Sequence, residues 1–123
     1  MIQSRTIINV ADNSGAKKIS CIQVKGTSKK GVGHIGDIII ASIKELKPNT
    51  TKLKRGDICK AVIIATKKKT KRLDGTTVSF GENLAVLVNN DYKPIGTRIL
   101  YPITEELRGR DLTRVVAIAP SVL

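Results

Sequence analysis

Aromatic residues are nearly absent from this sequence, and their scarcity limits what the protein can bind. Its 123 residues include no Trp, two Tyr and one Phe, at Phe80, Tyr92 and Tyr101. Proteins that bind single-stranded nucleic acid stack successive bases on aromatic side chains, and three scattered rings do not build such a platform. The core must therefore be aliphatic, and any binding of nucleic acid must depend on something other than base stacking.

The residues that most often serve catalysis or metal binding are also scarce. His34 is the only histidine, and the two cysteines, Cys21 and Cys59, stand at no metal-ligand spacing. Both cysteines lie inside apolar runs, so we expect buried, free thiols rather than a disulfide. Glu105 and Glu106 are neighbouring carboxylates, but adjacent positions of a helix do not face each other. We therefore predict no metal site, no cofactor and no enzymatic activity.

Long apolar segments are missing too. The longest uninterrupted apolar runs have five residues, such as Ala61 to Ala65, whereas a membrane-spanning helix needs about 20. The first residues, MIQSR, match neither a secretory signal peptide nor an Arg-rich transit helix. We expect a soluble protein without a membrane partner, which works where it is made unless a leader has already been removed.

Positive charge is abundant and unevenly distributed. The chain has 22 Lys and Arg against 10 Asp and Glu, a formal net charge of +12. Residues 17–30 carry five Lys and no acid, residues 44–72 carry eleven basic residues and two acids, and residues 73–107 carry two basic and five acidic residues. A polyanionic partner relieves the repulsion among like charges, and solubility alone does not require them to be segregated. A solvated basic face is the alternative interpretation.

The hydrophobic pattern predicts a single domain, residues 1–123, that is mainly β. Apolar runs separated by turn residues predict five main strands, at 6–11, 18–25, 37–44, 58–66 and 84–88. The third run is apolar on both faces, which suits a closed barrel with another segment packed outside it. We therefore predict a small five-stranded β-barrel over about residues 1–100.

Two appendages are predicted to extend from this barrel. Residues 66–80 read as a basic β-ribbon that projects from it, with a two-residue turn at Asp74-Gly75. Thr104 and Asp111 can each cap a short helix. We predict two short C-terminal helices, in a flap over about residues 103–123 that offers a cover for one barrel opening.

A glycine-rich segment, residues 31–36 (GVGHIG), fits the G-x-G-x-x-G pattern of dinucleotide-binding proteins. That pattern binds a pyrophosphate only where a helix opens at its end. The Ile-rich residues 37–44 predict a strand instead, so we interpret the glycines as a flexible loop beside Lys29 and Lys30. A nucleotide-using enzyme is the alternative, and it requires saturable dinucleotide binding that is lost on Gly33→Ala.

The basic stretches predict binding to folded RNA, which is held through phosphate, sugar and shape. Alternate side chains of a ribbon point to opposite faces, so a basic arm can contact phosphates on both sides. A free-standing binder of single-stranded RNA is the second alternative, and it should bind an unstructured oligonucleotide equally well. The candidate RNA-binding residues are Lys17, Lys18, Lys29, Lys30, Lys52, Lys54, Arg55, Lys67, Lys68, Lys69, Lys71 and Arg72.

The N-terminal stretch MIQSRTIINVADNSGAKKISCIQV closely resembles the start of the L-fourteen family of large-subunit ribosomal proteins, in its bacterial and organellar form. The resemblance continues through residues 61–64 (AVII), Asp74-Gly75, Phe80, Asn83 and Val86-Leu87. It extends through residues 94–99 (PIGTRI), 106–108 (ELR) and 117–120 (AIAP), and so covers essentially the whole chain.

This resemblance implies a five-stranded barrel with a ribbon and two short helices, and a structural role in the large ribosomal subunit. It implies binding to large-subunit rRNA, contacts with ribosomal proteins three and nineteen, and bridges to small-subunit rRNA. The protein would lie on the ribosome, in the bacterial cytoplasm or in the matrix of a plastid or mitochondrion. By position, Thr97, Arg98 and Arg114 fall in the interface region where a ribosome-silencing factor docks on members of the family.

The sequence departs from the family's common pattern near that interface. Leu100-Tyr101 stands where Phe-Gly is common, Glu105 replaces a common Arg, and Ser121 replaces a common Glu. These changes leave the predicted RNA binding intact. They lie near the interface flap, so we expect them to alter the contact with the silencing factor and the details of the bridges.

Overall fold

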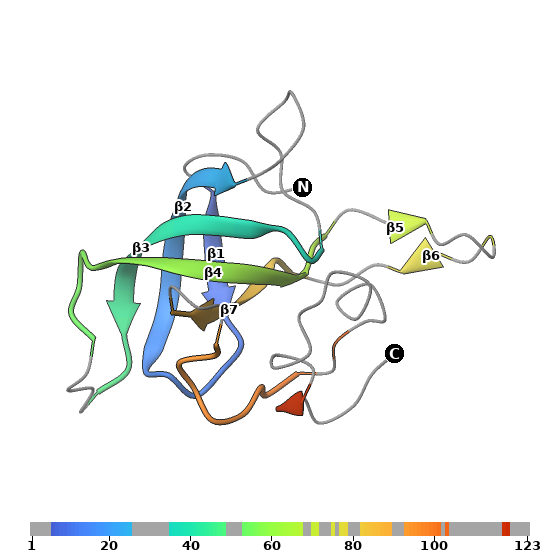
Figure 1. Cartoon of the computed structure of the whole chain (residues 1–123). Helices are drawn as coiled ribbons and strands as arrows, with labels where there is room; N and C mark the ends of the chain where they lie inside the picture. The colour runs from blue at the N-terminus through green and yellow to red at the C-terminus, as the bar shows by residue number, and fades with distance from the viewer. Residues whose placement is uncertain are drawn as a thin grey trace.

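The computed structural model is a closed barrel of five strands, as the sequence predicts (Figure 1). The strands are β1 (Ile7–Val10), β2 (Ala16–Lys25), β3 (Ile38–Leu46), β4 (Ile58–Ala65) and β7 (Leu84–Val88), in the order β1-β2-β3-β4-β7. Neighbours in this order are antiparallel except β1 and β7, whose parallel pairing closes the barrel. The structure describes residues 6–25, 35–48, 53–67, 70–71, 75, 77–78, 82–89, 93–101, 103 and 117–118.

Aliphatic side chains fill the inside of the barrel. Alternate residues of each strand point inward, so that Ile8, Ile19, Ile39, Ile43 and Ile63 are fully buried. The described residues of this cluster are all aliphatic apart from Cys21 and Cys59, in agreement with the aliphatic core that the composition requires. Cys21 lies within it and Cys59 packs against its edge, and both are free thiols as predicted.

A second apolar cluster covers the outer face of β4 and β7. Val62 and Ile64 of β4 and Val86 of β7 point away from the barrel interior, yet they are fully buried. They pack with Ile99 and Ile103, and Ile118 lies against the same cluster. Ile99, Ile103 and Ile118 therefore cover the side of the barrel. Most of the predicted flap, and with it the predicted cover of a barrel opening, lies outside the described residues. Burial on both faces explains the unbroken apolar runs of these two strands.

The pairing of β2 with β3 contains three register shifts. Ala16 pairs with Leu46, Lys18 with Glu45 and Ile19 with Ile43, so that Lys17 and Lys44 are each an extra residue in the ladder. A third shift, between Cys21 and Gln23, makes Ile22 an extra residue as well. Such β-bulges bend a strand and redirect its side chains.

The basic ribbon is present as a separate two-stranded sheet of β5 (Thr70–Lys71) and β6 (Thr77–Val78). It projects to one side of the barrel (Figure 1). Lys71 pairs with Thr77, which leaves residues 72–76 between the paired positions. Gly75 has a positive φ of 89°, and the other residues around the turn predicted at Asp74-Gly75 lie outside the described part of the chain.

The two predicted C-terminal helices fall almost entirely on residues outside the described part of the chain, and the prediction is neither confirmed nor excluded. Of this flap, Ile103, Ala117 and Ile118 are described, and the backbone N–H of Ile99 donates to the carbonyl of Ile118 at 3.1 Å. Within the described ranges, no helix is long and apolar enough to cross a membrane.

The first turn is built around a buried carboxylate. Asp12 is fully buried, and its Oδ1 accepts hydrogen bonds from the backbone N–H of Ser14 at 3.1 Å and from the Ser14 hydroxyl at 2.6 Å. Its Oδ2 accepts one from the backbone N–H of Leu87 at 3.1 Å. Burial raises the pKa of Asp12, against the lowering effect of these hydrogen bonds and of Lys47. One side chain thus joins the turn after β1 to β7.

Replacing this carboxylate should destabilise the barrel. In Asp12→Asn, one oxygen becomes an amino group, which leaves either Leu87 or Ser14 without its acceptor. An unsatisfied buried donor costs about 1–3 kcal/mol, and we expect the free energy of unfolding in urea to fall by that amount. Asp57→Asn is the control, because Asp57 is exposed, and it should cost less than about 1 kcal/mol. Equal losses in the two variants would contradict the assigned role of Asp12.

The thiol of Cys59 should react slowly at neutral pH. Burial, with the negative charges of Asp57 and Asp12, raises its pKa to about 11 from a usual 9.0. Because only the thiolate is nucleophilic, alkylation of Cys59 at pH 8 should be roughly ten to a hundred times slower than in the unfolded protein. Mass spectrometry of the Cys59 peptide, over a series of pH values, measures the rate. A rate that is half-maximal near pH 9 in the folded protein would show that the thiol is unshifted.

Candidate RNA-binding interface

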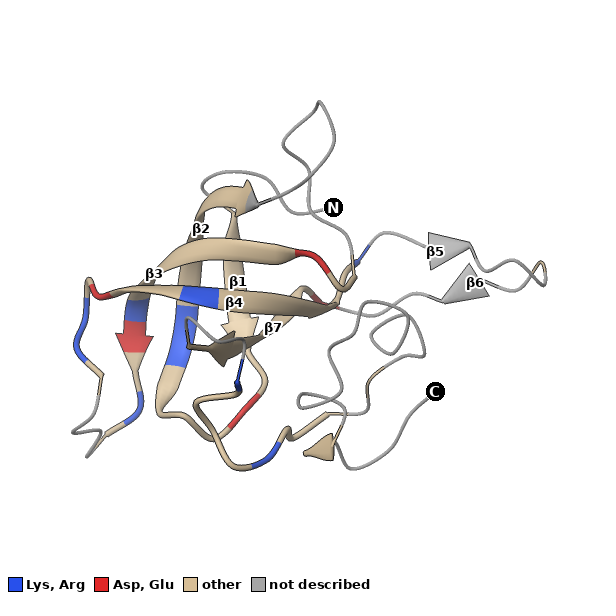
Figure 2. Ribbon diagram, in the orientation of Figure 1, with Lys and Arg blue, Asp and Glu red and all other residues tan. Residues whose placement is uncertain are grey.

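Basic side chains gather at the end of the barrel where β2 begins and β3 ends. Figure 2 shows the blue segments of β2, β3 and the turn before β4 close together there. We call this group the barrel-end cluster, and it consists of Lys17, Lys18, Lys44, Lys47, Lys54 and Arg55. Glu45 and Asp57 are the acidic residues among these segments. Four of the predicted RNA-binding residues, Lys17, Lys18, Lys54 and Arg55, are therefore brought together by the fold.

The turn that carries Lys54 and Arg55 is fixed to β3 by backbone hydrogen bonds. The N–H of Gly56 donates to the carbonyl of Ile43 at 2.7 Å, and the N–H of Ile43 donates to the carbonyl of Asp57 at 2.9 Å. Inside the turn, the N–H of Lys54 donates to Asp57 Oδ2 at 3.0 Å. Gly56 has a positive φ of 90°, which a residue with a side chain rarely adopts. The exposed Arg55 is thereby held beside Lys44 at the end of β3.

The other side of the cluster is fixed to the first turn of the chain. The N–H of Lys47 donates to the carbonyl of Gly15 at 2.8 Å. Gly15 has a positive φ of 108°, which ends the 12–15 turn and starts β2. Lys17 and Lys18 follow immediately, with Lys17 exposed and Lys18 half-buried.

A second predicted site, at Thr97 and Arg98, is held by a single asparagine. Asn13 Oδ1 accepts hydrogen bonds from the backbone N–H groups of Thr97 at 2.7 Å and Arg98 at 3.2 Å. Asn13 Nδ2 donates to the Thr97 hydroxyl at 2.7 Å, and the Asn13 N–H donates to the carbonyl of Arg98 at 3.3 Å. The side chains of Thr97 and Arg98 stay exposed. This loop is therefore rigidly placed but open to a partner.

Gly96 allows the two loops to approach this closely. A Cβ at residue 96 would lie 2.7 Å from Asn13 Oδ1 and 3.2 Å from the backbone nitrogen of Ser14. Next to this loop, Leu100 and Tyr101 are 47% and 42% exposed, so the two departures from the family pattern form an apolar surface beside Arg98.

The remaining predicted residues are only partly described. Lys67 is exposed where β4 leads toward the ribbon, and its backbone N–H donates to Asn83 Oδ1 at 3.0 Å. Lys71 lies on β5. The predicted residues outside the described part of the chain are Lys29, Lys30, Lys52, Lys68, Lys69, Arg72 and Arg114, together with Glu105 and Ser121.

Sequence reasoning missed four residues at these sites. Lys44 was assigned to the end of the strand predicted at 37–44, and Glu45 and Lys47 were given no role, because the arrangement of this strand end depends on its pairing with β2. Asn13 was given no role either, because its partners lie 84 and 85 residues further along the chain. No local signal identifies such long-range pairs.

The described residues offer little for a metal or for the dinucleotide alternative. No group of three or more His, Cys, Asp and Glu in the described ranges is arranged to hold a metal ion. The backbone after Gly36 leads into β3 at Ile38, so a strand and not a helix follows the glycine-rich segment. The feature on which pyrophosphate binding depends is therefore not formed there.

A comparison with protein families identifies the relatives of this chain. The family model described as ribosomal protein L14p/L23e matches residues 1–123. The chain belongs to the ribosomal protein L14p/L23e family. The predicted membership is thereby confirmed. Members of the L14p/L23e family are structural constituents of the ribosome and are generally not enzymes, which places this protein on the ribosome as a structural component.

The attachment of the Thr97–Arg98 loop to Asn13 can be tested directly. Asn13→Ala removes the side-chain oxygen that accepts hydrogen bonds from the loop backbone. The loss of these bonds should cost at least about 1.4 kcal/mol, which corresponds to a factor of ten, so we expect amide hydrogen exchange at Thr97 and Arg98 to become at least about tenfold faster. Thr97→Val is the matched variant, because it removes only the hydroxyl hydrogen bond and should change the exchange much less. Unchanged exchange in Asn13→Ala would show that Asn13 does not hold the loop.

Proposed function

We propose that this member of the L14p/L23e family is a constituent of the large ribosomal subunit that binds folded large-subunit rRNA. The observation that carries the proposal is the barrel-end cluster, in which six cations stand on the start of β2, on the end of β3 and the residue that follows it, and on the turn before β4, and hydrogen bonds join the backbones of these segments. Because the backbones that carry these cations are already fixed, no loop has to be ordered when the cations meet phosphates. Such a surface favours a partner whose phosphates are themselves fixed in space.

The scarcity of aromatic side chains supports a folded RNA rather than a single strand. Tyr101 is the only aromatic residue in the described part of the chain, and it lies near Arg98, not in the barrel-end cluster. This surface can therefore bind RNA through its phosphates, its riboses and its shape, but the cluster has no aromatic side chain on which a base could stack. The basic ribbon supplies a second set of cations that can contact the same RNA or a neighbouring helix of it.

We infer that the Thr97–Arg98 loop faces the small subunit and takes part in bridges to small-subunit rRNA. Its support is the combination of exposed side chains and a backbone fixed by Asn13. Arg114 would belong to the same surface. Ribosomal proteins three and nineteen are the proposed protein neighbours. The exposed apolar pair Leu100 and Tyr101 would be part of any docking surface for a ribosome-silencing factor.

Sedimentation of cell extracts tests this function. The protein should migrate with the large ribosomal subunit at moderate salt and leave it only after a high-salt wash, because neutralising phosphates makes affinity fall steeply with salt. Recovery of the protein solely in light fractions that contain no RNA would refute the proposal.

The ribbon should contribute to RNA binding without supporting the barrel. Replacing Lys67, Lys68, Lys69, Lys71 and Arg72 by Gln should weaken binding to large-subunit rRNA. The slope of log affinity against log salt should become shallower by up to about 0.9 for each phosphate that the ribbon no longer neutralises. The melting temperature should stay within a few degrees, because β5 and β6 form a sheet of their own. A large fall in melting temperature would show that the ribbon is needed for the fold.

A further inference from the structure

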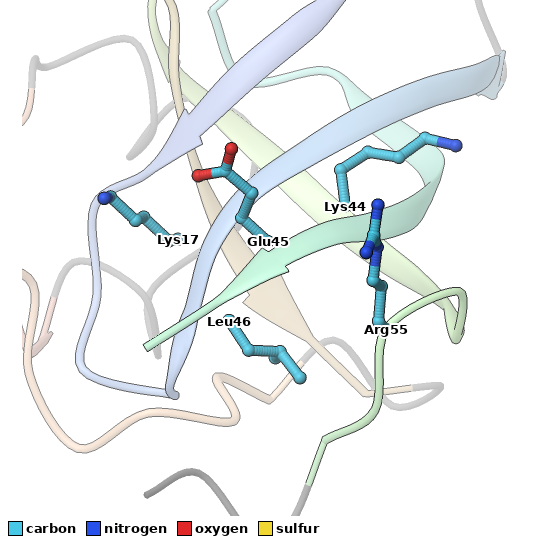
Figure 3. A pocket seen from close by; sticks show the side chains of 5 residues that line it. All are labelled: Lys17, Lys44, Glu45, Leu46 and Arg55. Atoms are coloured by element: carbon cyan, nitrogen blue, oxygen red, sulfur yellow. The ribbon is translucent and has the colours of Figure 1, made fainter. Parts of the chain in front are cut away.

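A hollow at the barrel end brings together residues of β2, β3 and the turn before β4. Its volume is about 410 Å³, and it is lined by Lys17, Lys44, Glu45, Leu46 and Arg55. Figure 3 shows the Lys44 and Arg55 side chains next to each other, with the Glu45 carboxylate between Lys44 and Lys17. Leu46 lies on the other side of β3 and packs against the interior cluster, which anchors the end of the strand.

The two bulges of β2 and β3 create this arrangement. Side chains normally alternate between the faces of a strand, yet Lys44 and Glu45 are both exposed. Lys44 is the extra residue of β3, and Lys17 is the extra residue of β2, one step further along the same ladder. The bulges therefore place one cation on each side of Glu45, and the fixed turn adds Arg55 next to Lys44.

The charges around the hollow are not neutralised within the described part of the protein. Lys17, Lys44, Glu45 and Arg55 are all exposed, and none of them makes an ion pair with a described residue. Two cations side by side repel each other and favour an anion between them. The carboxylate of Glu45, in contrast, repels an anion and can only accept hydrogen bonds. A ligand that fits the hollow therefore offers a hydrogen-bond donor to Glu45 in addition to its anionic groups.

We propose that this hollow binds one ribose–phosphate step of an RNA backbone. The phosphate lies on Lys44 and Arg55, and the ribose 2′-hydroxyl donates a hydrogen bond to the carboxylate of Glu45. Lys17 meets the phosphate on the other side of that ribose. An RNA backbone places a hydroxyl donor between two phosphates. This order matches the hollow, where the carboxylate of Glu45 lies between the cations on either side. DNA lacks the 2′-hydroxyl and therefore lacks this donor. This inference rests on the proposed function and assigns RNA selectivity to Glu45.

Binding to large-subunit rRNA, with full-length protein, tests the cationic part. Lys44→Gln and Arg55→Gln should each weaken binding about tenfold, as expected for a hydrogen bond between charged groups, and should reduce the salt slope by about 0.9. Lys93→Gln is the matched control, since Lys93 is an exposed lysine on another loop. It should change affinity by less than about twofold. Effects of Lys44→Gln and Arg55→Gln no larger than the control's would overturn the proposal.

The sign of the change at Glu45 distinguishes a hydrogen-bond acceptor from simple electrostatics. If Glu45 only repels phosphates, Glu45→Ala and Glu45→Gln both tighten binding. If it accepts from a 2′-hydroxyl, Glu45→Ala weakens binding about fivefold or more, whereas Glu45→Gln retains an acceptor and weakens it less. Tighter binding by Glu45→Ala would overturn the proposal.

Removal of single 2′-hydroxyls from the RNA locates the donor. The probe is an rRNA transcript with 2′-deoxynucleotides incorporated at random, separated into bound and unbound fractions. At one position at least, the deoxy substitution should interfere with binding of the wild-type protein and not with binding of Glu45→Ala. An identical interference pattern for the two proteins contradicts the assignment of Glu45 but leaves the proposed function standing. Failure of the wild-type protein to bind the unsubstituted transcript overturns both.

Discussion

The parallel pairing of β1 with β7 is the constraint on which the rest of the structure depends. Asn9 and Val10 pair with Leu84 and Ala85, and the N–H of Ala11 donates to the carbonyl of Ala85 at 2.9 Å. This short ladder joins the two ends of the sheet and leaves the barrel without a free edge, which is where sheets otherwise aggregate. It also brings the 12–15 turn to β7, where the buried carboxylate of Asp12 secures it.

Both candidate surfaces follow from that closure. The 12–15 turn holds the Thr97–Arg98 loop through Asn13 on one side and receives the end of β3 through Gly15 on the other. The barrel-end cluster therefore stands on elements that are themselves tied to the closing strands. A small aliphatic barrel provides little recognition chemistry of its own, so bulges, turns and a ribbon carry the charged side chains.

Much of the fold could be predicted from the sequence because its signals are local. Five apolar runs between turn residues indicated the strands. The ribbon was found from its basic residues and the turn signal at Asp74-Gly75, and its two short strands pair as a separate sheet. A segment packed outside the barrel was inferred from the apolar pattern on both faces of the strand predicted at 37–44. The residues that form this outer layer could not be predicted, because they are brought together by long-range packing.

The candidate sites were predictable only in part, for the same reason. Lys17 and Arg55 belong to basic stretches that are visible in the sequence, but their proximity to Lys44 depends on two bulges and on hydrogen bonds between Ile43 and the turn at 56–57. Thr97 and Arg98 were identified from family resemblance, and nothing in the sequence indicates that Asn13 fixes their backbone. Charge distribution thus predicts the kind of partner, and three-dimensional pairing decides which charged side chains lie close together.

We propose that cations on the fixed backbone of an aliphatic barrel recognise an RNA that is already folded. The most direct measurement is the affinity of the purified protein for folded large-subunit rRNA over a range of salt concentrations, beside that for an unstructured oligoribonucleotide. The account predicts tighter binding to the folded RNA at every salt concentration, and a log–log slope that corresponds to several phosphates. Equal affinity for the two RNAs, or no binding to the folded one in dilute buffer, would contradict it.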